Sequence, residues 1–234
     1  MSRRTDDLPL HQEVLLLALR DDKGTSSPCA NLHLGLGAAM LAELLLQERV
    51  KVVEEKRRKF LELVDGSEHD DELLDAALEK LAKAKRRAQL GTWVQRFSTI
   101  PRLHHRAAEQ LVDRGILKVE EGKVLWLFKR TVYPELDGRV EDAILARLSK
   151  AIFTRTREIE ARTVVLASIA NSTGLLRANF PARKLKENKH RLEKLTKGEL
   201  VGKAASEAVE AATAAIVVAS VIPAVAATTV ATSS

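Results

Sequence analysis

Aromatic residues make up only 3% of this 234-residue chain, so its core must be built from Leu, Val and Ala. Ala and Leu are strong helix formers, whereas the cores of β-rich proteins usually draw on aromatic residues. Hydrophobic residues (45%) and charged residues (30%) stand in the proportion of an ordinary folded protein rather than a disordered one. The sequence therefore predicts a mainly α-helical fold with a sizeable core.

Helical spacing of apolar residues organises the first 50 positions. The tripeptide Asp7–Pro9 precedes an apolar run at Val14–Leu19 and indicates a capped helix that ends near Gly24. A loop is expected at residues 25–34. A second helix is then expected over Gly35–Arg49, with Leu and Met side chains repeating along one face.

A charged segment, Glu54–Lys59, separates two short β-type runs, Val50–Val53 and Phe60–Val64. This pattern predicts a β-hairpin. Asp70 or Asp71 then caps a helix whose apolar residues form a single inward stripe. The stripe consists of Leu73, Leu74, Ala77, Leu78 and Leu81.

A further helix followed by a second hairpin is indicated downstream. The helix is expected over Pro101–Arg114, and Gly115 ends it in the C′ position. We expect strands at Ile116–Val119 and Val124–Phe128, joined by a turn at residues 120–123. The second strand is apolar at every position, whereas a surface hairpin normally leaves one face to water. Both faces are therefore expected to meet apolar surroundings: the core on one side, and a partner or a bilayer on the other.

Helical patterns continue to the C-terminal region, and no repeat of 20–50 residues is visible. The expected helices are Val140–Ile152, Glu158–Leu176, Pro181–Leu195 and Lys203–Ile222. The uncharged segment 211–231 is long enough to cross a bilayer, but it is mostly Ala, Thr and Ser and contains Pro223, so we expect a packed helix. The fold class expected is a single-domain helical bundle with two small β-hairpins, one of them protruding and apolar. Its domain spans residues 9–222, between tails at 1–8 and 223–234.

Positive charge is concentrated in one part of the chain. The net charge is +6, yet residues 83–130 alone hold 12 Lys and Arg against four acids, a local excess of +8. Such a region favours an anionic partner without choosing between lipid and nucleic acid. Each Lys or Arg near an anionic leaflet contributes about 1 kcal/mol. Trp126 suits a membrane interface, because its ring is apolar while its N–H stays wet; the alternative is that it belongs to the core.

Nothing in the sequence singles out an enzyme, a metal centre or a cofactor. The lone Cys29 excludes an internal disulfide and a thiolate zinc cluster, and fits a reducing cytoplasm. His104 and His105 have no acid or Cys at metal-ligand spacing. Gly35-Leu36-Gly37 lacks the rest of a phosphate loop, and the N-terminus lacks the apolar core of a signal peptide. A non-enzymatic protein is expected, although a site assembled from distant residues would not be visible at this level.

Three segments, in this order and spacing, resemble the Golgi phosphoprotein 3 family: Leu10–Leu17, Met40–Leu44 and Leu111–Leu117. The resemblance covers about Leu8 to Val218. It implies a mostly helical peripheral membrane protein that binds phosphatidylinositol 4-phosphate and uses a protruding apolar hairpin for membrane contact and self-association. The hairpin residues that correspond are Leu125, Trp126, Leu127 and Phe128.

The head-group site that the resemblance implies carries over only in part. The family's Trp and Arg around the second helix fall near Pro28 and at Gly37. Its two basic residues at the start of the helix before the hairpin fall near Pro101 or Arg102 and at His104. Most of the family's pocket charge is therefore absent, and a different anionic lipid fits as well. The short loop and the Ala/Val-rich tail resemble bacterial relatives, which have no Golgi.

Two function classes fit these patterns. The favoured one is a cytoplasmic, peripheral protein that binds an anionic phospholipid membrane and forms homo-oligomers through the hairpin. Its expected head-group residues are Arg96, Arg102, His104 and Arg106. The alternative is a winged-helix nucleic-acid binder, because a basic helix followed by a hairpin is also the sequence pattern of a winged-helix domain. The apolar second strand argues against a wing, since wings that contact phosphate are polar or basic.

Overall fold

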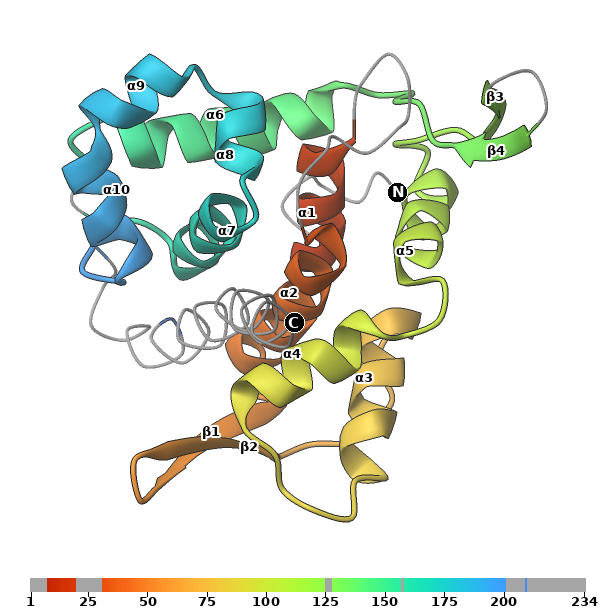
Figure 1. Cartoon of the computed structure of the whole chain (residues 1–234), viewed down its shortest axis with the longest axis vertical. Helices are drawn as coiled ribbons and strands as arrows, with labels where there is room; N and C mark the ends of the chain where they lie inside the picture. Colours follow the sequence, from red (N-terminus) through yellow and green to blue (C-terminus); the bar gives the residue numbers. More distant parts are fainter. Residues whose placement is uncertain (1–7, 20–30, 125–127, 157, 201–208, 210–234) are drawn as a thin grey trace, which may run out of the picture.

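The computed structural model describes residues 8–19, 31–124, 128–156, 158–200 and 209. This part of the chain forms ten helices and two separate antiparallel sheets of two strands each (Figure 1). The prediction of a mainly α fold with two small hairpins is confirmed.

Two helices from the N-terminal part lie in the middle of the molecule (Figure 1). In α1 (Leu10–Ala18) all nine residues are buried, and α2 (Leu32–Leu46) packs against it. The second helix begins three residues before the predicted start at Gly35, so the predicted loop at 25–34 is wrong at its C-terminal end. The physical reason is that Leu32 and Leu34 pack against the core, which extends the buried helix.

A helix that the sequence analysis missed, α4 (Leu90–Ser98), crosses α2 at close range. The close approach depends on Gly37 in α2. A Cβ atom at this position would lie 2.5 Å from the carbonyl oxygen of Val94 and 2.8 Å from the backbone nitrogen of Ser98. Gly37 therefore stands where the resemblance would place an Arg, and the backbone of α4 occupies the space that any side chain would need.

The first hairpin is confirmed and is longer than predicted. Strand β1 (Val50–Glu55) pairs with β2 (Arg58–Leu63), so the charged segment continues the ladder. Lys56 and Arg57 both have positive φ, at 49° and 65°, as a two-residue hairpin turn requires. Asp71 then caps α3 (Glu72–Ala82), and the predicted apolar stripe of this helix is buried.

The second hairpin differs from the prediction. Helix α5 (Leu103–Asp113) ends before Gly115, whose φ of +72° confirms the expected C′ position. Strand β3 (Glu120–Val124) then pairs with β4 (Phe128–Val132), so the residues predicted as the turn form a strand instead. The predicted strands at 116–119 and 124–128 are wrong. Ile116 and Leu117 are buried, and Leu117 forms a β-bridge with Glu135, so the two-stranded ladder begins further along the chain.

Leu125, Trp126 and Leu127 lie outside the described residues, and the side chain of Phe128 is likewise not described. The predicted apolar tip therefore stays a prediction. Five helices complete the described fold: α6 (Arg139–Phe153), α7 (Ala161–Ser172), α8 (Leu175–Asn179), α9 (Ala182–Glu187) and α10 (Lys189–Thr196).

Of the three helices predicted after residue 157, the first two are each divided in two. Gly174, with a φ of +82°, separates α7 from α8, and Asn188 separates α9 from α10. The predicted helix over Lys203–Ile222 lies outside the described residues except for Val209, as does the uncharged segment 211–231. None of the helices within the described ranges has both the length and the hydropathy of a membrane span.

Buried charges join α1 and α2 to the C-terminal helices. Arg147 on α6 donates to the Glu13 carboxylate at 2.7 Å, and Arg162 on α7 donates to Glu43 at 2.9 Å. Glu43 also accepts the backbone N–H of Leu10 at 2.7 Å. Burial raises the pKa of Glu13, while the charges of Arg147 and Arg162 act in the opposite direction.

Amide and imidazole groups join α1 to α3 and α5. Gln12 donates to Gln110 at 2.9 Å and to the Asp71 carboxylate at 3.3 Å. His11 lies 3.2 Å from the same Gln110 oxygen and 3.5 Å from Asp71. The side chain that caps α3 is therefore also a buried partner of α1, which fixes the start of α3 against the core.

The α2–α4 crossing predicts that Gly37→Ala destabilises the protein. Helix propensity alone would stabilise the variant by about 1 kcal/mol. Forcing a methyl group into backbone atoms costs typically about 1–3 kcal/mol, so we expect a net loss of up to about 2 kcal/mol in the free energy of unfolding. Urea denaturation measures this value. In the control, Gly66→Ala, the nearest atom to the new Cβ belongs to the flexible Leu63 side chain, and a change below about 0.5 kcal/mol is expected. A Gly37→Ala variant more stable than the parent would contradict the crossing.

Candidate basic site

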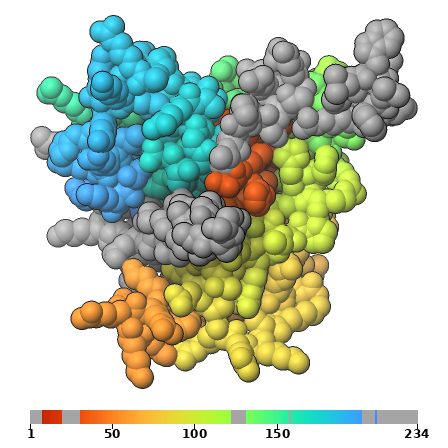
Figure 2. Space-filling model, viewed as in Figure 1, coloured from red at the N-terminus to blue at the C-terminus, as the bar shows by residue number. Residues whose placement is uncertain are grey.

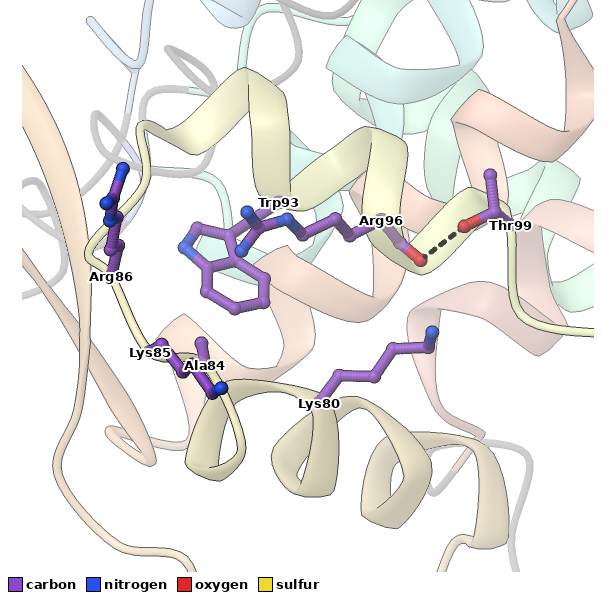
Figure 3. A pocket seen from close by; sticks show the side chains of 7 residues that line it. All are labelled: Lys80, Ala84, Lys85, Arg86, Trp93, Arg96 and Thr99. Carbon is purple, nitrogen blue, oxygen red and sulfur yellow. Dashed lines mark hydrogen bonds between the residues drawn. The ribbon is translucent and has the colours of Figure 1, made fainter.

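An open pocket lies between the C-terminal end of α3 and the outer face of α4 (Figure 3). Its volume is about 440 Å³. The lining residues come from the end of α3, the loop that follows, and α4: Lys80, Ala84, Lys85, Arg86, Trp93, Arg96 and Thr99. Four of the seven are basic and none is acidic, so the pocket is a concentrated positive site.

The pocket cations differ from their neighbours in having no acidic partner. Lys80, Lys85, Arg86 and Arg96 make no ion pair within 4 Å with any described residue, and all four are exposed. Lys83 and Arg87, in the same tract, are both paired: Lys83 with Glu79, and Arg87 with Glu55 and Glu62. The basic tract therefore divides into residues whose charge is already countered and residues that face the pocket.

Trp93 forms the apolar floor of the pocket, and Arg96 covers it. The guanidinium carbon of Arg96 lies 4.5 Å from the centre of the indole ring, a cation–π arrangement (Figure 3). Because the two residues are three apart on α4, they lie on one face of the helix. Trp93 is 2% exposed, and its indole N–H is buried without a hydrogen-bond acceptor among the described residues.

Two of the predicted head-group residues are ion-paired. Arg102 donates to Glu109 at 2.8 Å, and Arg106 donates to Glu72 at 2.5 Å. Arg102 also has a positive φ of 56° where α5 begins. A carboxylate beside each guanidinium reduces the positive potential that an incoming anion would meet.

A third predicted residue, His104, lies with aromatic neighbours at the base of the second hairpin. Its ring meets the His105 ring edge-on with centroids 5.2 Å apart, and both histidines pack near Tyr133, just after β4. Nδ1 of His105 lies 3.1 Å from the Tyr133 hydroxyl. Burial, reinforced by the charge of Glu109, raises the pKa of Tyr133, so the phenol stays protonated at neutral pH.

The structure therefore gives the four predicted head-group residues different surroundings. Arg102 and Arg106 have acidic partners, His104 packs beside Tyr133, and only Arg96 belongs to a set of unpaired cations. Sequence reasoning missed the other three cations of that set, Lys80, Lys85 and Arg86, and it also missed Trp93. The missed signal was the helical spacing of Leu90, Trp93, Val94 and Phe97, which would have placed Trp93 and Arg96 on one helix.

A second basic surface lies on α9 and α10. Residues 182–197 hold seven Lys and Arg against two Glu. Arg183 pairs with Glu187, Lys189 pairs with Glu193, and Arg191 donates to two backbone carbonyls. In Figure 2 this surface, in blue, lies apart from α3 and α4, in yellow. The two basic surfaces are therefore separate.

Metal chemistry has no candidate in the described part of the chain, where no three His, Cys, Asp or Glu side chains are grouped as ligands.

A protein-family model matches most of the chain. The model of the family described as Golgi phosphoprotein 3 (GPP34) matches residues 10–212. No curated protein matches the chain. The matched range contains both the helices of the core and the whole of the basic pocket.

The stacked pair predicts that Arg96→Gln uncovers the indole. In a Trp126→Phe background Trp93 is the only tryptophan, so its fluorescence can be followed alone. Losing the guanidinium should make acrylamide quench Trp93 about twofold more strongly, because the ring loses its cover. Lys83→Gln removes the same charge away from the ring and should leave quenching unchanged. Equal quenching in all three proteins would show that Arg96 does not cover Trp93.

Proposed function

The chain belongs to the Golgi phosphoprotein 3 (GPP34) family, and on this premise we propose that it is a non-enzymatic, cytoplasmic, peripheral membrane protein that binds anionic phospholipid. The observation that carries the proposal is a set of four cations around one pocket that form no ion pair with any described residue: Lys80, Lys85, Arg86 and Arg96. Unpaired basic side chains gathered in one place attract an anionic surface most strongly.

The size of the attraction follows from the number of cations. At about 1 kcal/mol for each Lys or Arg close to an anionic leaflet, four cations supply roughly 4 kcal/mol. Screening by salt reduces this attraction, because the Debye length is about 10 Å at 0.1 M and about 3 Å at 1 M. Such binding is reversible, and a second contact would make it more stable.

The apolar segment 124–128 is the proposed second contact. It connects β3 to β4, which lie at the top right of Figure 1, whereas α3 lies in the lower half. The hairpin and the pocket would then act as separate contacts, one apolar and one electrostatic. Self-association through the hairpin is the other use of this segment that the family suggests.

The proposal names anionic phospholipid as the class of ligand, with phosphatidylinositol 4-phosphate as the member that the family suggests. Two of the family's basic head-group positions are filled differently here: Gly37 lies at the α2–α4 crossing, and His104 packs beside Tyr133. The positive charge is instead concentrated on the α3–α4 pocket. Selectivity for the 4-phosphate therefore has less support than binding to negative charge.

Vesicle flotation tests the proposal. The protein should float with vesicles containing phosphatidylglycerol at 50 mM salt, remain unbound to vesicles of phosphatidylcholine alone, and lose about 90% of its binding at 500 mM salt because of screening. In the same assay Trp126→Ser with Leu127→Ser should lower binding if the segment enters the bilayer. Absence from both kinds of vesicle would end the proposal. Tight, salt-sensitive binding to random duplex DNA in its place would favour the nucleic-acid alternative.

A further inference from the structure

We infer that the pocket between α3 and α4 is a specific site for a phosphate monoester group, held by Arg86 and Arg96 over the Trp93 indole. The inference deepens the proposed function and rests on it for the lipid as one source of the phosphate. The site is separate from the positions to which the family's head-group residues correspond, since neither Gly37, Arg102 nor His104 lines this pocket.

The side-chain donors of Arg96 lie over the Trp93 ring without an acceptor among the described residues. The guanidinium carbon is 4.5 Å from the centre of the indole ring, and no described residue accepts a hydrogen bond from the side chain. The N–H groups of a guanidinium lie in its plane, so stacking through the face leaves them available at the edge. A fork of this kind binds two oxygens of one phosphate at the same time.

The charge of the site matches a monoester better than a diester. A phosphate monoester carries about −1.5 to −2 charges at neutral pH and three terminal oxygens. A phosphodiester carries a single negative charge. The four cations of the pocket have no described carboxylate to neutralise, so a dianionic group would be the better counter-charge. The volume of about 440 Å³ is also in the range of small-molecule sites.

The indole N–H of Trp93 is an independent observation that points to a ligand. This donor is buried and has no acceptor among the described residues, which is uncommon for a Trp in a protein interior. In Figure 3 the indole nitrogen is at the end of the ring on the side of Arg86. An oxygen of a phosphate bound on that side of the ring would accept a hydrogen bond from this N–H and so supply the missing partner. The hydroxyl of Thr99 is already used, because it donates to the Arg96 carbonyl at 2.9 Å.

A phosphate monoester can come from a lipid head group or from a soluble metabolite. Two arms of one experiment distinguish these sources. The first arm titrates the Trp126→Phe protein with glycerol 3-phosphate and follows Trp93 fluorescence, with calorimetry as a second readout. The second arm compares vesicles that contain phosphatidic acid, a monoester, with phosphatidylglycerol vesicles, a diester, adjusted to equal surface charge.

The pocket variants are Arg86→Gln with Arg96→Gln, and Lys85→Gln with Arg86→Gln. The second pair leaves the Arg96–Trp93 stack intact, so it remains informative if the first disturbs folding. The matched control, Lys83→Gln with Arg183→Gln, removes the same two charges from exposed ion pairs outside the pocket. Thermal unfolding shows which variants remain folded.

We expect glycerol 3-phosphate to bind saturably, and each pocket variant to weaken it at least about tenfold while the control binds like the parent. Preference for phosphatidic acid over phosphatidylglycerol, lost in the pocket variants, would identify the lipid source. Binding of glycerol 3-phosphate without binding to any vesicle would keep the monoester site, assign a soluble ligand and end the proposed function. Equal binding of both lipids by the parent, weakened in the pocket variants, without a response to glycerol 3-phosphate, would overturn the monoester site while leaving the proposed function standing.

Discussion

A helix buried on every side cannot place its polar residues in water, and α1 is such a helix. Its three polar positions after Leu10, at His11, Gln12 and Glu13, are each at most 1% exposed. A buried polar group without a partner costs free energy, so neighbouring helices must supply partners. Two arginines form ion pairs with Glu13, while Gln110 and Asp71 are the polar partners of His11 and Gln12. The arrangement of α3, α5, α6 and α7 around α1 follows from these contacts.

The same contacts determine where the basic site lies. Asp71 accepts from Gln12 and also caps α3, so the start of α3 is fixed to the buried helix. Lys80 lies near the C-terminal end of the eleven-residue helix α3. The loop that follows places Lys85 and Arg86 beside α4. The glycine at position 37 lets α4 lie directly on α2, and this close packing directs Trp93 and Arg96 outward into the pocket.

A cation that is ion-paired with a neighbouring carboxylate attracts an anionic partner less strongly than an unpaired one. The chain is rich in Lys and Arg, but Arg87, Arg102 and Arg106 are each held by a Glu. Counting charge along the sequence treats these residues and the pocket cations alike. The fold separates them, because pairing depends on which elements lie side by side. The unpaired set is therefore a property of the tertiary structure.

The sequence predicted what depends on local pattern. The apolar stripe of α3, its Asp71 cap, the first hairpin and the C′ glycine at 115 all follow from spacing and from backbone preferences, and all are confirmed. The predicted register of the second hairpin was wrong, because the burial of Ile116 and Leu117 and the bridge between Leu117 and Glu135 are tertiary effects.

The pocket could not be predicted from the sequence for a related reason. Helix α4 was overlooked, and its partners in the pocket come from a different helix and loop. Only Arg96 was identified among the pocket residues. Its neighbours Lys85 and Arg86 were counted only within the basic region 83–130, since nothing in the linear order separates them from the paired Lys83.

The central claim is that an anionic membrane binds to the unpaired cations around the α3–α4 pocket, rather than to the more numerous but scattered cations of α9 and α10. Hydrogen–deuterium exchange, measured with and without phosphatidylglycerol vesicles, tests this directly. The account predicts slower exchange in residues 80–99 and unchanged exchange in residues 182–197. Slower exchange in residues 182–197, with residues 80–99 unaffected, would contradict it.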